Sequence, residues 1–158
     1  MPMQGRLLSL EVIVRWLALM ACVACSGGDD EAPPVDPVEE GCLQTGTGTP
    51  TDAGATPEQA KALAPGLDPH LVGLYPDQVS YVTVTTGAGT LVLMSDTEDV
   101  FTSIETDGTP GEIPDAFENP TCGQDIPTVH EVPVSAGTHL IGIGPSYKAT
   151  VWVLVAEK

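Results

Sequence analysis

Most of the chain after residue 78 alternates between short runs of strand-forming residues and tight turn signals. Residues 79–85 read Val-Ser-Tyr-Val-Thr-Val-Thr, and residues 90–94 read Thr-Leu-Val-Leu-Met after a glycine-rich turn. β-Branched and aromatic residues bounded by glycine are typical of strands. Closely spaced short strands without a long helical period predict an all-β fold. We therefore expect a single antiparallel β-sandwich of about seven strands over roughly residues 71–157.

Two segments predict β-hairpins with the same turn chemistry. The first has Gly87-Ala88 as a two-residue loop, with glycine at the position that a type II′ turn requires. In that register Val84 lies opposite Leu91. The second has Ala136-Gly137 at its tip and places Val134 opposite His139. The repeated Ala-Gly-Thr turn fits either a diverged duplication or common turn chemistry.

Four further segments complete the expected layout. Residues 100–106 predict a strand, and residues 149–156 predict a strand with apolar side chains on both faces, which must be central or covered on both sides. Residues 57–63 predict a short helix with Thr56 as its N-cap. Residues 107–127 are rich in proline and glycine and predict a long connection without regular structure.

The N-terminal segment has the order of an export signal. Positive charge at Arg6 and Arg15 precedes the stretch WLALMACVACSGGDD, in which an apolar run ends in small residues and cysteine and then turns acidic. The apolar run is shorter than the roughly 20 residues that span a bilayer. The stretch resembles the lipobox end of a bacterial lipoprotein signal peptide. The resemblance implies a lipid-modified cysteine and a location in the cell envelope.

Two cysteines compete for that lipid. Cys22 has the favoured leucine three residues before it, but it shortens the apolar run and leaves an odd number of cysteines in the mature chain. Cys25 leaves two, so we expect lipidation at Cys25, with Cys22 as the alternative. Residues 1–24 are then the signal peptide, 25–41 a lipidated, disordered acidic tether, and 42–158 the β-sandwich domain. Because Ser26 is not an inner-membrane retention aspartate, the outer membrane is favoured.

The two remaining cysteines predict one disulfide. Cys42 follows the tether and Cys122 lies in the long connection, and in an oxidising envelope such a pair is expected to bond. The bridge would close a loop of roughly 80 residues, worth about 4 kcal/mol in the chain-entropy model. A redox or metal-thiol site is disfavoured, because no Cys-x-x-Cys remains in the mature chain and no histidine lies near either cysteine.

The charge excludes whole classes of partner. The chain has 22 acidic and 5 basic residues, and only Lys61, Lys148 and Lys158 follow the predicted signal. Phosphate recognition needs clustered lysine and arginine, so we expect no nucleic-acid partner. Contact with a membrane would have to come through the N-terminal lipid.

Acidic loops are the only metal-site candidates in the sequence. Asp96, Glu98 and Asp99 follow one predicted strand, and Asp107 opens the long connection. Calcium binds oxygen ligands of this kind, although the EF-hand spacing is absent. Copper is disfavoured, because no methionine follows Met94. His130 and His139 lie near opposite ends of the second hairpin, and we expect both at strand edges.

These patterns favour a protein without catalysis. The sequence has no Gly-x-Ser-x-Gly, His-Glu-x-x-His or phosphate-loop motif. The final stretch AGTHLIGIGPSYKATVWVLVAEK vaguely resembles the jelly-roll-like β-sandwiches appended to secreted bacterial peptidases, which supports the sandwich. We expect a lipid-anchored envelope protein that displays its domain to an envelope protein or a polysaccharide. The alternatives are a calcium-binding or carbohydrate-binding module and an envelope enzyme. Exposed aromatic side chains would favour sugar binding, and only Tyr147 lies at an obvious loop tip.

Overall fold

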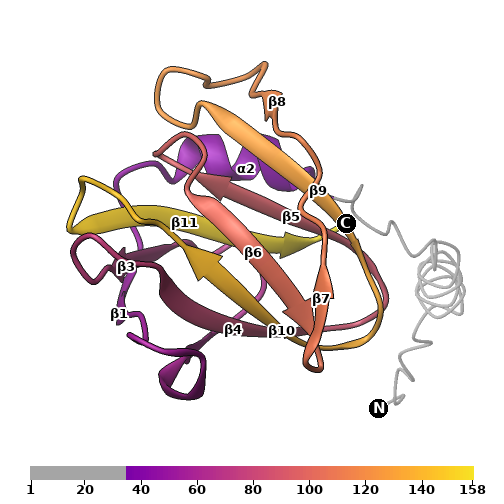
Figure 1. Cartoon of the computed structure of the whole chain (residues 1–158). Helices are drawn as coiled ribbons and strands as arrows, with labels where there is room; N and C mark the ends of the chain where they lie inside the picture. The colour runs from indigo at the N-terminus through magenta and orange to yellow at the C-terminus, as the bar shows by residue number, and fades with distance from the viewer. Residues whose placement is uncertain (1–34) are drawn as a thin grey trace, which may run out of the picture. The chain divides into compact units, whose positions relative to one another are not determined.

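The computed structural model describes residues 35–158, which form a β-sandwich with one short helix (Figure 1). The elements in chain order are α2 (Pro37–Leu43), β1 (Thr49–Asp52), the 3-10 turn η1 (Pro57–Gln59), β2 (Lys61–Leu63), β3 (His70–Gly73), β4 (Ser80–Thr86), β5 (Gly89–Ser95), β6 (Phe101–Thr106), β7 (Thr109–Gly111), β8 (Phe117–Glu118), β9 (Thr128–Val134), β10 (Gly137–Ile143) and β11 (Thr150–Glu157). The helix among these residues is too short to cross a membrane. The predicted all-β sandwich is confirmed.

The strands form two sheets that pack face to face. The six-stranded sheet has the order β1-β3-β11-β5-β9-β8, and the five-stranded sheet has the order β2-β4-β10-β6-β7. Most pairs are antiparallel, but β1 pairs with β3 and β2 pairs with β4 in parallel, so both sheets are mixed. The fold has more strands than the expected seven because four short ones, β1, β2, β7 and β8, border the sheets.

Both predicted hairpins are wrong. β4 and β5 lie in different sheets, and so do β9 and β10. Instead, β4 pairs with β10, with Val84 beside His139, and β5 pairs with β9, with Leu91 beside Val132. Each Ala-Gly turn therefore carries the chain from one sheet to the other, and the two arches stack on each other. The apolar alternation is satisfied either way, because both arrangements bury the same face of each strand.

The space between the sheets is the main core. Its members are mostly aliphatic residues at alternate positions of the long strands, and they are almost fully buried. The cluster includes Val72, Val82, Val84, Leu91, Leu93, Ile104, Val132, Ile141, Ile143, Val151, Val153 and Val155. Burial of such side chains is the chief favourable term in folding.

A second apolar cluster covers the outer face of the six-stranded sheet. Trp152 and Leu154 on β11, together with Met94 on β5, pack with Ile126 from the long connection and with Val38 of α2. β11 is thus third in its sheet and buried on both faces, as its sequence predicts.

α2 begins inside the segment predicted to be a disordered tether. Asp36 caps it by accepting a hydrogen bond from the Val38 amide, and Pro37 occupies the first turn. Gly41 lies against Met94 and Leu154. Because a seven-residue helix is marginal alone, packing on the sheet stabilises it, which composition does not reveal. Residues 25–34 of the predicted tether lie outside the described residues.

Two other expected elements differ from the prediction. The helix expected over residues 57–63 is only the turn η1, and Thr56 makes no side-chain cap. Residues 61–63 instead form β2, because pairing with β4 buries Leu63 in the main core. The long connection, expected to lack regular structure, carries β7 and β8 at the sheet edges.

Candidate functional site

The predicted disulfide is present and ties the helix to the long connection. Cys42 and Cys122 are bonded, with their Cα atoms 5.7 Å apart. Asn119, which is buried, holds the loop at this point, because its side-chain oxygen accepts hydrogen bonds from the amides of Thr121 and Cys122 at 2.9 and 3.2 Å. The bridge therefore fixes the cover of the six-stranded sheet. It is a structural element and not a free thiol pair.

The acidic calcium candidates do not meet in one place. One oxygen of Asp96 accepts a hydrogen bond from the Trp152 amide at 3.0 Å, and the other forms an ion pair with Lys148 at 3.0 Å. Asp107 accepts a bond from the Thr138 amide. Glu98 and Asp99 are exposed in the loop after β5. Within residues 35–158 no three His, Cys, Asp or Glu side chains are grouped so that they could hold a metal ion.

The histidines are buried, and the prediction that they lie at strand edges is wrong. His139 is fully buried, with its ring nitrogens 2.8 and 2.9 Å from the hydroxyls of Thr86 and Thr106. His130 contacts the carbonyl oxygen of Pro114 and packs edge-on against Phe101. These contacts give each ring a polar partner inside the sandwich, although Nε2 of His130 has none, and within residues 35–158 no carboxylate contacts either ring.

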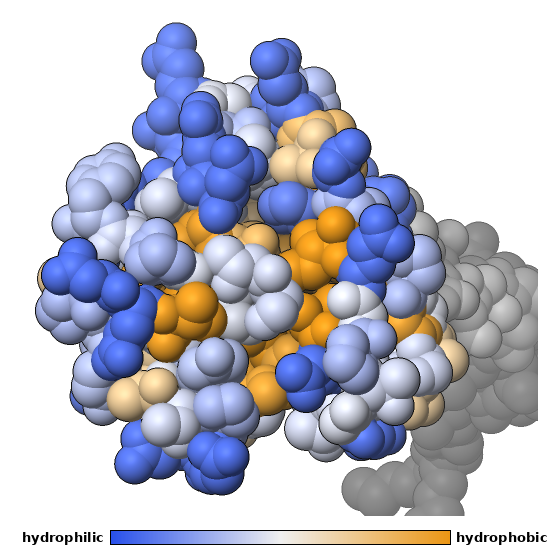
Figure 2. Space-filling model, in the orientation of Figure 1, coloured by the Kyte–Doolittle hydropathy of each residue, from blue (hydrophilic) through white to orange (hydrophobic). Residues whose placement is uncertain are grey.

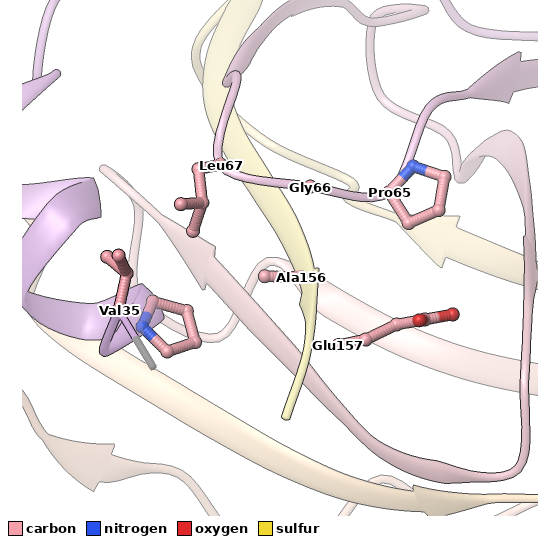
Figure 3. A pocket seen from close by; sticks show the side chains of 7 residues that line it. Val35, Pro65, Gly66, Leu67, Ala156 and Glu157 are labelled. Carbon is pink, nitrogen blue, oxygen red and sulfur yellow. The ribbon is translucent and has the colours of Figure 1, made fainter. Parts of the chain in front are cut away.

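One cavity lies where the described chain enters the sandwich. It has a volume of about 300 Å³ and is lined by Val35, Pro37, Pro65, Gly66, Leu67, Ala156 and Glu157. Figure 3 shows Val35, Leu67 and Ala156 around it, with the carboxylate of Glu157 turned away from them. The lining is largely apolar and offers no catalytic pair. We call this region the entry end. It also includes the turns at Gly87-Ala88 and Ala136-Gly137 and the C-terminal residues Glu157 and Lys158.

The turns at the entry end carry small side chains. Thr86 and Gly137 are partners across β4 and β10, so the two Ala-Gly turns lie side by side. The Gly87 amide donates to the Glu157 carboxylate at 3.0 Å, and the Lys158 amine lies 2.6 Å from Glu131. That carboxylate raises the pKa of the Lys158 amine by hydrogen bonding and charge. The polar groups at this end are therefore largely occupied by one another.

The opposite end is built from three loops that hydrogen bonds hold together. Residues 74–79 and 144–149 are joined by the Leu74 amide and the Ala149 carbonyl at 2.8 Å. The Gly144 amide bonds to the carbonyl of Val100 at 2.7 Å, and the Lys148 amine bonds to the carbonyl of Asp96 at 2.9 Å, which attaches residues 96–100. We call these three loops the tyrosine end. The loops after β3 and β10 lie at the left of Figure 1, on the side away from the C-terminus.

Two exposed tyrosines mark this end. Tyr147 is 90% exposed and Tyr75 is 41% exposed. The exposure of Tyr147 fits its predicted place at a loop tip. Sequence reasoning missed Tyr75, although its position after β3 and before Pro76-Asp77 is a turn signal that indicates a second tip. The tyrosine end is the strongest candidate functional site among the described residues.

The outer face of the five-stranded sheet is the other open surface. Its outward side chains are mostly small and polar, such as Thr83, Thr85 and Thr138, with Leu140 half-buried among them. In Figure 2, which shares the orientation of Figure 1, apolar residues appear as several patches between polar ones, and the patches near the centre lie close together. This side is therefore mixed and is not one uniformly apolar sheet face.

No protein-family model matches the chain, and no curated protein matches it. Cys22 and Cys25, the two lipidation candidates, lie outside the described residues.

Proposed function

We propose that the protein is a lipid-anchored cell-envelope protein that performs no catalysis and presents its β-sandwich to a partner. The observation that carries this proposal is the stretch from Trp16 to Asp30, in which an apolar run ends at Cys25 and is followed by an acidic spacer. Such a segment implies export, cleavage before the cysteine and acylation of its thiol. Cys25 is the modified residue, and the outer membrane is the destination where a cell has one.

The disulfide supports export independently of the signal. Structural disulfides form and persist in oxidising compartments such as the periplasm and cell surface, and are rare in the cytosol. The Cys42–Cys122 bridge joins segments 80 residues apart and fixes α2 onto the sheet. The bridge and the signal therefore favour the same compartment.

The entry point of the chain supports display. Val35 lies beside Ala156 at the last residues of β11, while the tyrosine end adjoins the first residues of that strand. At about 3.3 Å per residue, the length of β11 separates the two ends by about 23 Å. Residues 26–34 are nine in number and can span at most about 30 Å. An anchor at Cys25 would thus join the domain at the entry end, and the tyrosine end lies at the other end of β11.

Membrane fractionation tests the anchor. In a bacterial host that processes lipoproteins, we expect the chain to fractionate with membranes and its N-terminal peptide to carry acyl chains by mass spectrometry. Cys25→Ala should abolish both, and Cys22→Ala should leave both intact. The reverse result would assign the lipid to Cys22, and soluble protein without acylation in all three cases would refute the anchor.

A thermal melt tests the calcium alternative. A ligand at roughly 100 times its dissociation constant stabilises the folded state by about 2.7 kcal/mol, which shifts the midpoint by several degrees. We expect equal melting temperatures with calcium and with chelator, because Asp96 and Asp107 have structural partners in different places. A higher midpoint in calcium, removed by Asp99→Asn, would replace the display role with a calcium-dependent one.

A further inference from the structure

We propose that the tyrosine end binds a basic segment of another protein, with Tyr75 and Tyr147 as its aromatic contacts. This inference names the partner class for the proposed display function, and it depends on the interaction role and not on the lipid. The surface consists of residues 74–79, 96–100 and 144–149, defined above by the hydrogen bonds that join them.

The two tyrosines are suited to contact a partner at low entropic cost. They are large, have two side-chain torsions each, and stand on loops whose backbones are already fixed. Tyr75 is held by its amide, which donates to the Ser80 hydroxyl at 2.9 Å. The loop of Tyr147 is held on both sides, by Gly144 and by the Lys148 amine. Preorganised aromatic groups of this kind lose little freedom on binding.

The charge around the tyrosines selects a cationic partner. Asp77, Glu98 and Asp99 are exposed in the same loops. The one lysine there, Lys148, is neutralised by Asp96 at 3.0 Å. Arginine and lysine side chains stack on tyrosine faces and form charge-assisted hydrogen bonds with carboxylates. Two tyrosines among carboxylates that lack a cationic partner should therefore bind a guanidinium or ammonium group more tightly than an anionic group.

The charge of the whole domain favours the same partner. Residues 35–158 contain 18 acidic side chains and 3 lysines, and two of those lysines are in ion pairs. Such a field accelerates the approach of a basic surface and repels acidic ones. The field is spread over the domain, so the tyrosines are what locate the contact at one end.

A binding titration with a basic peptide tests the proposal. The probe is a fluorescein-labelled peptide of alternating arginine and glycine, and its control has glutamine in place of arginine. The full-length protein, purified in non-ionic detergent, is titrated and followed by fluorescence anisotropy. We expect saturable binding of the arginine peptide that weakens from about 20 to 150 mM salt, because screening shortens the range of exposed charges. Equal binding of the glutamine peptide would overturn the proposal.

Aromatic variants locate the contact. Tyr147→Ala and Tyr75→Ala should each weaken binding roughly two- to fivefold, as expected for exposed cation–π contacts of about 0.5–1 kcal/mol, and the double variant more. Phe117→Ala is the matched control, because Phe117 is 43% exposed and lies on edge strand β8, outside the three loops. An unchanged affinity in the double tyrosine variant, or an equal loss in the control, would refute the site.

Charge variants separate the site from the general field. Asp77, Asp99 and Asp107 all have left-handed backbones, with φ of 58°, 50° and 48°. Asparagine tolerates this conformation, so each Asp→Asn change removes charge without strain. The Asp77→Asn/Asp99→Asn pair should weaken binding severalfold and flatten the salt dependence. Asp107→Asn, at the entry end beside Gly137, should leave the affinity unchanged, and an equal loss there would indicate only non-specific attraction.

A glycan is the alternative ligand, and a separate titration detects it. Maltohexaose and chitohexaose are each titrated into the protein and followed by isothermal titration calorimetry, with the double tyrosine variant alongside. Tyrosine-dependent binding of either sugar, without binding of the arginine peptide, would replace the basic partner with a carbohydrate. Fractionation reports on the anchor and the titration on the surface, so failure of one does not imply failure of the other.

Discussion

The outer faces of the two sheets differ in what covers them. The six-stranded sheet is covered by α2 and by the loop around Ile126, and its outward side chains Met94 and Leu154 are fully buried. The five-stranded sheet has no such layer among the described residues, and its outward positions on β4 and β10 carry Tyr81, Thr83, Thr85, Thr138 and the half-buried Leu140. One sheet therefore has a core on each side, and the other has a core on one side only.

The comparison shows how a small cover can be kept in place. α2 has seven residues, and its sequence is acidic in the first turn with no basic residue in the last. A helix this short has little stability of its own, so it remains on the sheet because Gly41 allows close approach to Met94 and Leu154 and because Cys42 is bonded to Cys122. The bare sheet needs no such device, because its outward residues are compatible with water.

Removal of the disulfide should have the largest effect on the difference between the covered sheet and the open sheet, because the bridge holds the cover in place. Cys42→Ala/Cys122→Ala frees a loop with a sequence separation of 80 and should lower the free energy of unfolding by about 4 kcal/mol in the chain-entropy model. Urea denaturation checks this value. We also expect faster amide exchange in residues 37–43 than in β10. A loss below about 1 kcal/mol would mean that packing alone holds the cover.

Matched leucine truncations compare the two faces directly. Leu154→Ala, beneath α2, should lower the free energy of unfolding by about 3 kcal/mol, because the buried side chain leaves a cavity. Leu140→Ala, on the open face, should cost less than about 1 kcal/mol. Denaturant midpoints with unchanged m-values provide the comparison. Equal losses at the two positions would show that the open face is covered in solution.

Asn119 should contribute less than the disulfide that it positions. Asn119→Ala leaves the amides of Thr121 and Cys122 without their acceptor and should cost about 1–2 kcal/mol, because two hydrogen bonds are lost. Asn119→Asp retains the acceptor oxygens and is the control, with a smaller expected loss. A thermal melt of each variant measures the difference. If the aspartate variant is as unstable as the alanine variant, the amide group contributes through another contact.

The smallest effect is expected on the open face. The hydroxyls of Thr85 and Thr138 lie 3.1 Å apart across β4 and β10. Thr85→Ala removes an exposed cross-strand pair and should cost about 0.5 kcal/mol. Chemical denaturation resolves a change of this size if the m-value is held common to both proteins. A loss above about 2 kcal/mol would indicate that this face is more buried than its exposure suggests.

The features that the sequence predicted correctly are local or depend on few alternatives. The two apolar faces of residues 149–156 predict a strand buried on both sides, and β11 is buried on both sides. If Cys22 is removed with the signal peptide and Cys25 carries the lipid, only Cys42 and Cys122 remain to form a disulfide. The sequence therefore predicts the Cys42–Cys122 bridge without ambiguity. At the candidate site, turn chemistry predicts the exposed position of Tyr147, whereas the loop of Tyr75 lies at the same end only because β3 pairs with β11.

The sequence by itself determined where the long strands and the tight turns lie and which of their apolar residues face the core, because alternation and glycine-containing turns are local properties. Only the tertiary structure decided which strands pair. Val84 and Leu91 bury the same faces whether the chain returns within one sheet or crosses to the facing sheet, so the pattern does not distinguish a hairpin from an arch. The helix α2 and the buried positions of His130 and His139 follow from the same cause, since their partners come from distant segments.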